Sequence, residues 1–127
     1  MMTIGEMTHI KKSDVEVELS GDASAITVRL AGNADTRVKE DIRGFLEKTH
    51  QLASEQHIPK VLVDFRQLEF MNSACFKAFV TWLAMVRGLE AEKQYRIHFL
   101  ANDKIHWQRR SLRALSCFAS NVVSVEN

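Results

Sequence analysis

The sequence contains few cysteines, prolines and glycines, and each shortage excludes a class of protein. Its 127 residues include two cysteines, one proline and five glycines. Cys75 and Cys117 are too few and too far apart for a disulfide framework or a zinc site, so we expect a reducing, cytoplasmic setting. So little proline and glycine argues against a disordered or low-complexity chain. The remaining composition, 46% hydrophobic and 26% charged, is typical of a globular protein of one domain.

An excess of charge of one sign and long apolar runs are also missing. The formal net charge is +1, which gives no reason to expect a nucleic-acid partner. No apolar run approaches the roughly 18 residues that span a bilayer, and polar residues interrupt the opening segment MMTIGEMTHIKK, so we expect neither membrane insertion nor a signal peptide. Glycine-rich phosphate loops and clusters with metal-ligand spacing are absent, and the sequence therefore predicts no cofactor and no metal site.

The pattern of apolar residues predicts one α/β domain over residues 14–127, preceded by a loosely held arm over residues 1–13. Alternation of apolar and polar residues predicts strands, and apolar residues at three- and four-residue steps predict helices, with Pro59 ending the first helix. We expect strands at residues 15–20, 25–31, 61–65, 95–101 and 122–125, and helices from about Val38 to His57, Ser73 to Leu89 and Lys104 to Phe118.

The resulting order, β-β-α-β-α-β-α-β, predicts a mixed sheet with helices packed on it. The first two strands are joined by a short turn that contains Gly21, and we expect them to form an antiparallel hairpin. Strands that are separated by helices of this length need crossover connections and therefore pair in parallel. Residues 61–65 are mostly apolar, which is typical of a strand covered on both faces.

The reactive residues do not assemble a catalytic site, and we expect no enzyme activity. Cys75 lies near a predicted helix start, where a thiol can become a nucleophile, but no local signature places His98 or His106 beside it. A free cysteine in a small domain is more often a small core residue. Asp35 and Asp64 are candidates for a small acidic site; the plainer interpretation is a helix cap for Asp35 and a hydrogen-bonded carboxylate for Asp64.

A basic segment, His106-Trp-Gln-Arg-Arg-Ser-Leu-Arg113, leaves two interpretations open. Arg109, Arg110 and Arg113 can form a face that binds an anion, a membrane surface or a partner. The alternative is the solvated side of the third helix, with Trp107 partly packed. An exposed Trp107 would favour the binding face, because tryptophan and arginine are enriched in binding hot spots.

Asn72 and Ser73 stand where the strand at 61–65 has ended and the second predicted helix begins. Asparagine and serine are among the best N-cap residues, and a side-chain oxygen there bonds a free backbone N–H for about 1 kcal/mol. There is no capping box, because the third residue after Ser73 is Phe76 rather than a glutamate or glutamine. Capping alone is a sufficient explanation of this pair.

A longer segment around this pair resembles the central signature of STAS domains, a family that includes anti-sigma-factor antagonists and the cytoplasmic part of sulfate transporters. The segment is VLVDFRQLEFMNSACFKAFV, residues 61–80. In that family an apolar strand with an aspartate is followed by a loop and then by Asp-Ser at a helix start. LAGNAD, residues 30–35, also resembles the Gly-x-x-Asp turn before the first helix of the family. The resemblance implies the STAS fold from Val15 onward.

The resemblance also implies a function. In the antagonists that switch partners, the serine after that aspartate is phosphorylated by a cognate anti-sigma factor, a serine kinase with a histidine-kinase-like ATPase fold. The unmodified antagonist binds the kinase and frees its sigma factor, and phosphorylation releases the kinase. The implied phosphorylation site is Ser73, in a non-enzymatic regulator whose partner is such an anti-sigma factor or serine kinase. The implied partner-binding residues are Asn33, Asp35, Met71, Asn72, Ser73, Ala74, Cys75, Phe76 and Lys77.

Three residues depart from the pattern of the family. Asn72 stands where an aspartate is usual, which removes a negative charge beside the hydroxyl. Cys75 replaces a common glycine and adds a side chain to the surface that a kinase must approach. Lys77 replaces another frequent glycine one turn beyond Ser73, from where it can attract a phosphate or obstruct docking.

These departures keep open an alternative function, a STAS scaffold or transport accessory subunit in which Ser73 is only a helix cap. The two functions predict different surroundings for this serine. A switch predicts an exposed hydroxyl beside a partly uncovered apolar patch from Met71, Cys75 or Phe76. A scaffold predicts a buried hydroxyl that is bonded to a backbone N–H.

Overall fold

The computed structural model describes residues 9–12 and 14–127; residues 1–8 and 13, which make up most of the expected arm, lie outside the described residues. Within that segment His9–Lys12 forms strand β1, which pairs antiparallel with β2, Val15–Gly21. The sequence did not predict β1, because four residues are too few for a clear alternating pattern. The predicted hairpin therefore has a third antiparallel strand at the edge of the sheet.

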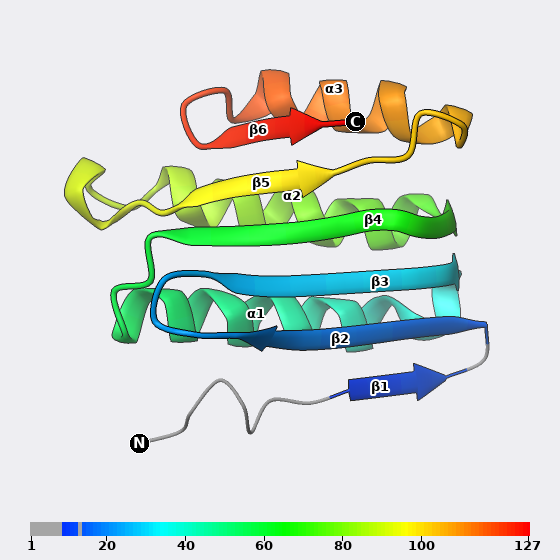
Figure 1. Cartoon of the computed structure of the whole chain (residues 1–127), viewed down its shortest axis with the longest axis horizontal. Coiled ribbons are helices and arrows are strands. Elements are labelled where there is room, and N and C mark those ends of the chain that lie inside the picture. Colours follow the sequence, from blue (N-terminus) through cyan, green and yellow to red (C-terminus); the bar gives the residue numbers. More distant parts are fainter. Residues whose placement is uncertain (1–8, 13) are drawn as a thin grey trace.

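Six strands form one mixed sheet in the order in which they occur along the chain, from β1 to β6 (Figure 1). The first three strands pair antiparallel, and the strands from β3 to β6 pair in parallel. The predicted α/β class and mixed sheet are therefore confirmed, with β1 added to the predicted order. The other strands are β3 (Ile26–Ala34), β4 (Lys60–Met71), β5 (Arg96–Leu100) and β6 (Val123–Glu126); the helices are α1 (Lys39–Glu55), α2 (Ser73–Arg87) and α3 (His106–Phe118), with short 3-10 helices η2 (Thr36–Val38) and η3 (Ala91–Lys93).

The α-helices α1, α2 and α3 all lie on one face of the sheet (Figure 1). Each of them connects two parallel strands that are neighbours in the sheet, and all three connections step in the same direction. Since such crossovers are almost always right-handed, steps in one direction place every helix on the same side. The expectation that residues 61–65 are covered on both faces is therefore wrong. Leu62 lies on the uncovered face between Thr27 and His98 and is only partly buried.

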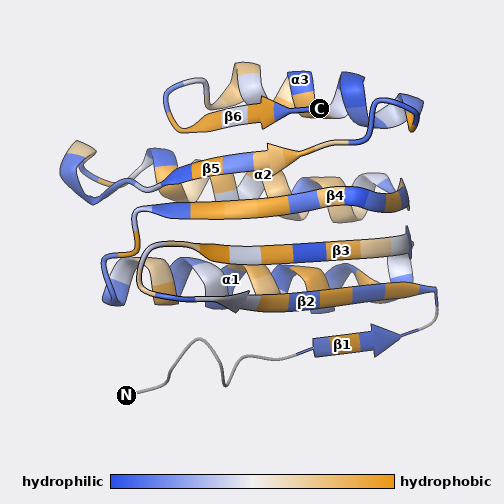
Figure 2. Ribbon diagram, viewed as in Figure 1, coloured by the Kyte–Doolittle hydropathy of each residue, from blue (hydrophilic) through white to orange (hydrophobic). Residues whose placement is uncertain are grey.

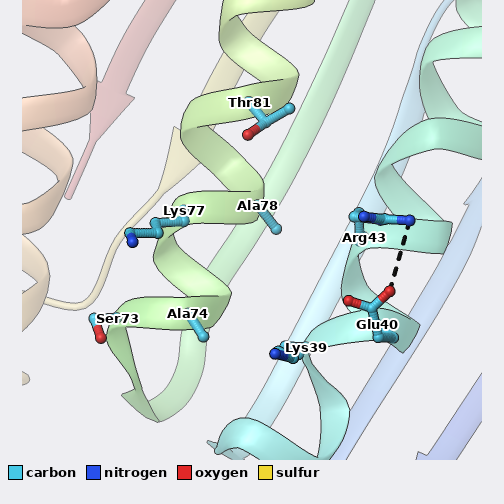
Figure 3. Close-up of a pocket in the computed structure, with 8 residues that line it drawn as sticks. All are labelled: Lys39, Glu40, Arg43, Ser73, Ala74, Lys77, Ala78 and Thr81. Atoms are coloured by element: carbon cyan, nitrogen blue, oxygen red, sulfur yellow. Dashed lines mark ion pairs between the residues drawn. The ribbon is translucent and has the colours of Figure 1, made fainter.

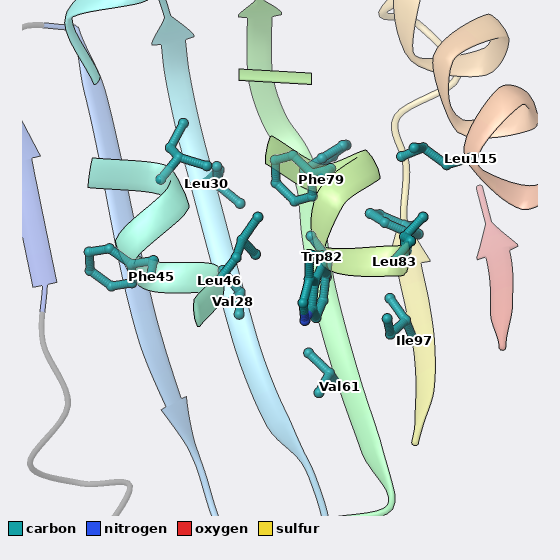
Figure 4. Packing of buried hydrophobic residues seen from close by; sticks show 14 of the residues in the cluster. Val28, Leu30, Phe45, Leu46, Val61, Phe79, Trp82, Leu83, Ile97 and Leu115 are labelled. Atoms are coloured by element: carbon teal, nitrogen blue, oxygen red, sulfur yellow. The ribbon is translucent and has the colours of Figure 1, made fainter. Parts of the chain in front are cut away.

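The hydrophobic core lies between the sheet and the layer of helices (Figure 4). Apolar residues alternate with polar ones along β2 and β3 and form a longer run in the first half of β4 (Figure 2). Phe65 of β4 contacts Phe79 of α2 and Phe99 of β5, with ring centroids 5.3 and 5.4 Å apart. Trp82 of α2 is also fully buried.

Strand β4 is longer than predicted and leads directly into α2. Its pairing with β3 continues to Met71, so the loop expected between the strand and the second helix is itself a strand. On the opposite edge, the ladder with β5 ends at Asp64. The second half of β4 therefore has no neighbouring strand on that edge.

Side chains at the start of α3 take the place of β5 along the second half of β4. The buried Gln108 donates from Nε2 to two carbonyl oxygens of β4 at 2.6 and 2.8 Å, and its Oε1 accepts from the N–H of Asn102 at 2.9 Å. Trp107 Nε1 donates to the carbonyl oxygen of Glu69 at 2.7 Å. Because buried backbone groups are costly to leave unpaired, these bonds stabilise the segment of β4 that positions the start of α2.

Gly32 forms a bulge inside β3. The strand was expected to end at residue 31, but it continues through Gly32 to Ala34. The φ of Gly32 is +93°, and a Cβ at this position would lie 1.9 Å from the carbonyl oxygen of Asp14. That oxygen accepts a hydrogen bond from the N–H of Asn33 at 2.8 Å, and the register with β4 shifts between Gly32 and Asn33. Only glycine combines this backbone conformation with so close an approach.

Candidate partner-binding surface around Ser73

Asn72 is the N-cap of α2. Its Oδ1 accepts a hydrogen bond from the N–H of Cys75 at 2.9 Å, which satisfies one free donor of the helix start. Its Nδ2 donates to Thr36 Oγ1 at 2.7 Å and ties the helix start to η2. An aspartate at this position keeps the first bond but lacks the Nδ2 donor. Asn72 therefore links two segments of the surface as well as capping the helix.

Ser73 is the first residue of α2, and it is exposed. Its hydroxyl forms no hydrogen bond within the part of the chain that the structure describes. The expectation that Ser73 serves only as the helix cap is wrong, because Asn72 has that role. The N–H groups of Ser73 and Ala74 precede the first intrahelical hydrogen bond, so the surroundings of the hydroxyl favour an anion.

The turn after β3 lies beside the start of α2, and the implied partner-binding residues come from both segments. The N–H of Asn72 donates to the carbonyl oxygen of Ala34 at 2.9 Å, and Asn33 pairs with Phe70 in the ladder of β3 and β4. The Sγ of Cys75 donates to the carbonyl oxygen of Asp35 at 3.4 Å. Two predicted segments that are distant in sequence thus form one surface at the carboxyl ends of the strands.

Cys75 is buried and does not belong to the exposed surface, which corrects the expectation that its side chain faces a partner. Burial, with a further contribution from the Asp35 carboxylate, raises the pKa of the Cys75 thiol to about 11. A thiol with this pKa is protonated near neutral pH and is a poor nucleophile. Cys75 packs as a small core residue, one of the two roles that the sequence left open.

The two aspartates considered for an acidic site are each bonded to an arginine two residues later. Asp35 caps η2, and hydrogen bonds from the side chain and N–H of Arg37 hold the pKa of its carboxyl below the usual value. Burial alone would raise the pKa of Asp64, but hydrogen bonds from Arg66 outweigh it and lower this pKa. Both carboxylates are structural.

A groove of about 340 Å³ runs between α1 and α2 beside Ser73 (Figure 3). Ala74 and Ala78 lie on the side of α2 that faces α1. Ser73 and Lys77 also line the groove, one turn apart, and their side chains are drawn on the other side of α2. The opposite wall comes from α1. The residues that line the groove are Lys39, Glu40, Arg43, Ser73, Ala74, Lys77, Ala78 and Thr81.

Apolar side chains near the start of α2 differ in exposure. Phe70, near the end of β4, is 47% exposed, and Met71 and Phe76 are partly buried against the core. Phe70 and Met71 are neighbours along β4, so their side chains point to opposite faces of the sheet. Met71 and Phe76 were expected at a partly uncovered patch beside Ser73 and are partly exposed, whereas Cys75, also expected there, is buried.

The arginines of α3 form a separate surface. Arg109, Arg110 and Arg113 are exposed, whereas Trp107 is partly buried and its ring lies against Phe65. Trp107 therefore lacks the exposure that would favour a binding face. Within the described residues, no helix has both the length and the apolar character needed to cross a membrane.

One group of side chains within the described residues has donor atoms close enough to share a metal ion: His9, Glu16 and Glu18. Glu16 already pairs with His9 at 2.6 Å and with Arg29 at 3.0 Å, and Glu18 pairs with Arg29 at 3.2 Å. The guanidinium group neutralises the carboxylates and opposes a second cation there. These residues stabilise the pairing of β1, β2 and β3.

Sequence reasoning missed the wall of the groove that α1 supplies. Lys39 and Arg43 are four residues apart, a spacing that places them on one side of a helix and that the sequence does contain. Nothing in the sequence indicated that this side lies next to Ser73, because the packing of α1 against α2 is a tertiary contact. Thr36, the partner of Asn72, was missed for the same reason.

Comparison with known proteins identifies the fold. No family model matches the sequence, and no curated protein matches it. Among solved structures, the chain is similar to an anti-sigma factor antagonist from Mycobacterium paratuberculosis, with a TM-score of 0.62 and 13% identity over 87% of this chain and 84% of that one.

The chain is also similar to the anti-sigma factor antagonist SpoIIAA in its unphosphorylated form, with a TM-score of 0.59 and 20% identity over 87% of this chain and 88% of that one. A third match is the Bacillus cell fate determinant SpoIIAA in the phosphorylated form, with a TM-score of 0.58 and 12% identity over 87% and 91% of the two chains. The chain has the STAS fold of anti-sigma factor antagonists.

Proposed function

We propose that the protein is a non-enzymatic regulator that binds a partner protein through the surface around Ser73, and that phosphorylation of Ser73 releases the partner. The observation that carries the proposal is the separation of the two polar residues at the start of α2. Asn72 caps the helix, while the hydroxyl of Ser73 is exposed and unbonded within the described residues. The partner is an anti-sigma factor or a serine kinase with a histidine-kinase-like ATPase fold, in keeping with the fold.

The position of Ser73 is suited to a phosphate. A phosphoserine carries a charge of roughly −2 near neutral pH, and the free N–H groups of a helix start stabilise an anion. Proteins of similar fold are described in both phosphorylated and unphosphorylated forms, which supports a phosphate on a domain of this kind. A partner that accepts a neutral hydroxyl is then repelled by added charge and bulk.

Mass spectrometry on the protein from its native cells tests the modification. Intact-mass and peptide spectra, with and without phosphatase treatment, are expected to map one phosphate to Ser73. A protein that carries no phosphate at Ser73 under growth and stress conditions would contradict the switch.

Partner capture with matched variants tests the consequence of the modification. Wild-type protein and Ser73→Ala are expected to retain the same anti-sigma factor or kinase, and Ser73→Asp is expected to lose it by at least about tenfold, or ~1.4 kcal/mol. Asn72→Asp is the matched control, because it adds the same charge one residue away and retains the cap. Equal capture by Ser73→Asp and wild type would contradict release by charge.

A transport accessory subunit is the second candidate, and the exposure of the α3 arginines favours it. Arg109, Arg110 and Arg113 all face solvent, and Arg109 and Arg113 line a second groove beside β6. For such a subunit, replacing these three arginines with alanine abolishes partner capture while Ser73→Ala leaves it intact. The first proposal expects the triple alanine variant to capture its partner normally.

A further inference from the structure

We infer that the groove between α1 and α2 binds an acidic segment of the partner protein, and that Lys39 and Lys77 are the residues that recognise it. The inference rests on the proposed function in taking the surface around Ser73 as the partner-binding surface. It adds the chemical character of the partner segment, which neither the fold nor the exposure of Ser73 specifies.

The charge of the groove points to an anionic occupant. Its lining contains Lys39, Arg43 and Lys77, with Glu40 as the single acidic residue. Glu40 is already paired with Arg43, at 3.6 Å. No hydrogen bond or ion pair to the ammonium group of Lys39 or of Lys77 occurs within residues 9–12 and 14–127. Two unpaired cations from two helices thus border one groove.

The shape of the groove suits a segment of polypeptide. Ala74 and Ala78 are four residues apart on α2 and face α1, so small side chains form the floor (Figure 3). Small residues let a third backbone approach two packed helices closely. We therefore assign the groove to a helical or extended segment that carries glutamate or aspartate side chains.

This arrangement gives phosphorylation a direct effect on binding. Ser73 lines the same groove as Lys77 and lies one helical turn away from it. A phosphate there competes with the carboxylates of the partner for the same cations, because like charges cannot share them without repulsion. Lys77 acts in both states: it attracts the partner when Ser73 is free and attracts the phosphate when Ser73 is modified.

Titration with a model peptide tests the inference without the native partner. The probe is a helical peptide of glutamate and alanine, added to the full chain labelled with ¹⁵N, and a lysine–alanine peptide is the control. The acidic peptide is expected to shift amide signals of Lys39, Arg43 and Ser73–Thr81, and to bind more weakly as salt rises from ~0.05 to ~0.3 M. Shifts that map to Arg109 and Arg113 of α3, or no binding at all, would overturn the assignment.

Charge-reversal variants identify the recognising residues. Lys39→Glu with Lys77→Glu is expected to weaken binding of the acidic peptide at least about tenfold. The control pair Lys60→Glu with Lys104→Glu makes the same change in net charge at exposed sites outside the groove and is expected to bind as wild type does. Ser73→Asp is expected to weaken binding several-fold, because its carboxylate competes with those of the peptide for Lys77. Equal losses in the two lysine pairs would overturn recognition by the groove.

The experiments distinguish failure of the groove assignment from failure of the phosphorylation switch. If peptide binding depends on Lys39 and Lys77 but Ser73 is never phosphorylated, the groove assignment is supported and the switch is wrong. If Ser73→Asp abolishes partner capture and the charge reversals at Lys39 and Lys77 leave it intact, the switch is supported and the groove assignment is wrong.

Discussion

Two adjacent polar residues at the start of α2 have different roles, because only one of them has a geometry that caps the helix. Asn72 has extended backbone angles and bonds the N–H of Cys75, whereas Ser73 is already helical and points its hydroxyl to solvent. The division matters for function, since Asn72 holds the helix start while the hydroxyl of Ser73 has no bonded partner within the described residues. Here the two tasks belong to different residues.

The stability of single variants tests whether Asn72 alone caps the helix. Asn72→Ala is expected to lower the free energy of unfolding by about 1–2 kcal/mol, because it removes the cap and the bond to Thr36. Ser73→Ala is expected to change it by less than about 0.5 kcal/mol, because the serine hydroxyl has no bonded partner within the described residues. Urea denaturation of both variants checks this. A loss for Ser73→Ala as large as that for Asn72→Ala would show that the serine contributes to the cap.

At the scale of elements, the surface around Ser73 depends on how β3 and β4 end. The bulge at Gly32 bends β3 so that Asn33 still pairs with Phe70, and side chains of α3 bond the unpaired edge of β4. The bulge and the side-chain hydrogen bonds let β3 and β4 continue past the end of β5. The turn after β3 and the start of α2 therefore lie side by side. Disturbing the bulge or these hydrogen bonds therefore changes both the stability of the domain and the shape of the surface.

Two glycines of this chain form a matched pair for testing the bulge. Gly32→Ala is expected to cost about 2 kcal/mol or more, because it combines a φ of +93° with a contact of 1.9 Å to a backbone oxygen. Gly44→Ala is expected to stabilise the protein by up to about 1 kcal/mol, because Gly44 lies in α1 and a Cβ there meets no atom within 4 Å. Urea unfolding of the two variants is the measurement; equal effects would contradict a special conformation at Gly32.

At the scale of the whole molecule, a hydrogen-bonded group joins α1, α2 and the start of β5. The hydroxyl of Tyr95 accepts from Trp82 Nε1 at 2.8 Å and lies 2.7 Å from His50 Nδ1. Burial raises the pKa of Tyr95, so the hydroxyl keeps its proton; when Nδ1 of His50 carries no proton, the hydroxyl donates a hydrogen bond to it. This arrangement needs an unprotonated Nδ1, and burial lowers the pKa of His50 accordingly.

The stability of the domain is therefore expected to depend on pH through His50. A histidine whose pKa is lower in the folded state contributes fully above its unfolded pKa of ~6.5, and the contribution falls as pH decreases below that value. The free energy of unfolding is expected to decline between about pH 6.5 and 5, at no more than ~1.4 kcal/mol per pH unit for one proton. His50→Gln is expected to flatten this slope relative to wild type, because it removes the group that gains a proton on unfolding. Identical pH profiles for the two proteins would contradict the assignment to His50.

Apart from β1, the element order, the mixed pairing of the sheet and the location of the helix start at Asn72–Ser73 could be predicted from the sequence. They depend on local periodicity and on capping chemistry, which neighbouring residues along the chain determine. Val38, Ile42 and Leu46 recur at four-residue steps from the predicted start of the first helix, and all three are buried. Predictions of this kind succeed because each element must bury its own apolar side.

Other features depended on contacts between distant segments, and local patterns do not contain them. The length of β4 depends on β3 and on Gln108 and Trp107, which come about 40 residues later. The choice of Asn72 over Ser73 as the cap depends on backbone angles that the ends of β3 and β4 determine together. The burial of Cys75, and its pKa, follow from the packing of α2 on the sheet.

The sequence by itself determined an α/β domain in which a helix starts at the polar pair Asn72–Ser73. Only the tertiary structure decided that all helices cover one face of the sheet, and that Lys39 of α1 and Lys77 of α2 border one groove beside Ser73. The physical reason is the range of the interactions. Hydrogen-bonded periodicity acts over a few residues, whereas a surface formed by two helices exists only after both have packed on a common sheet.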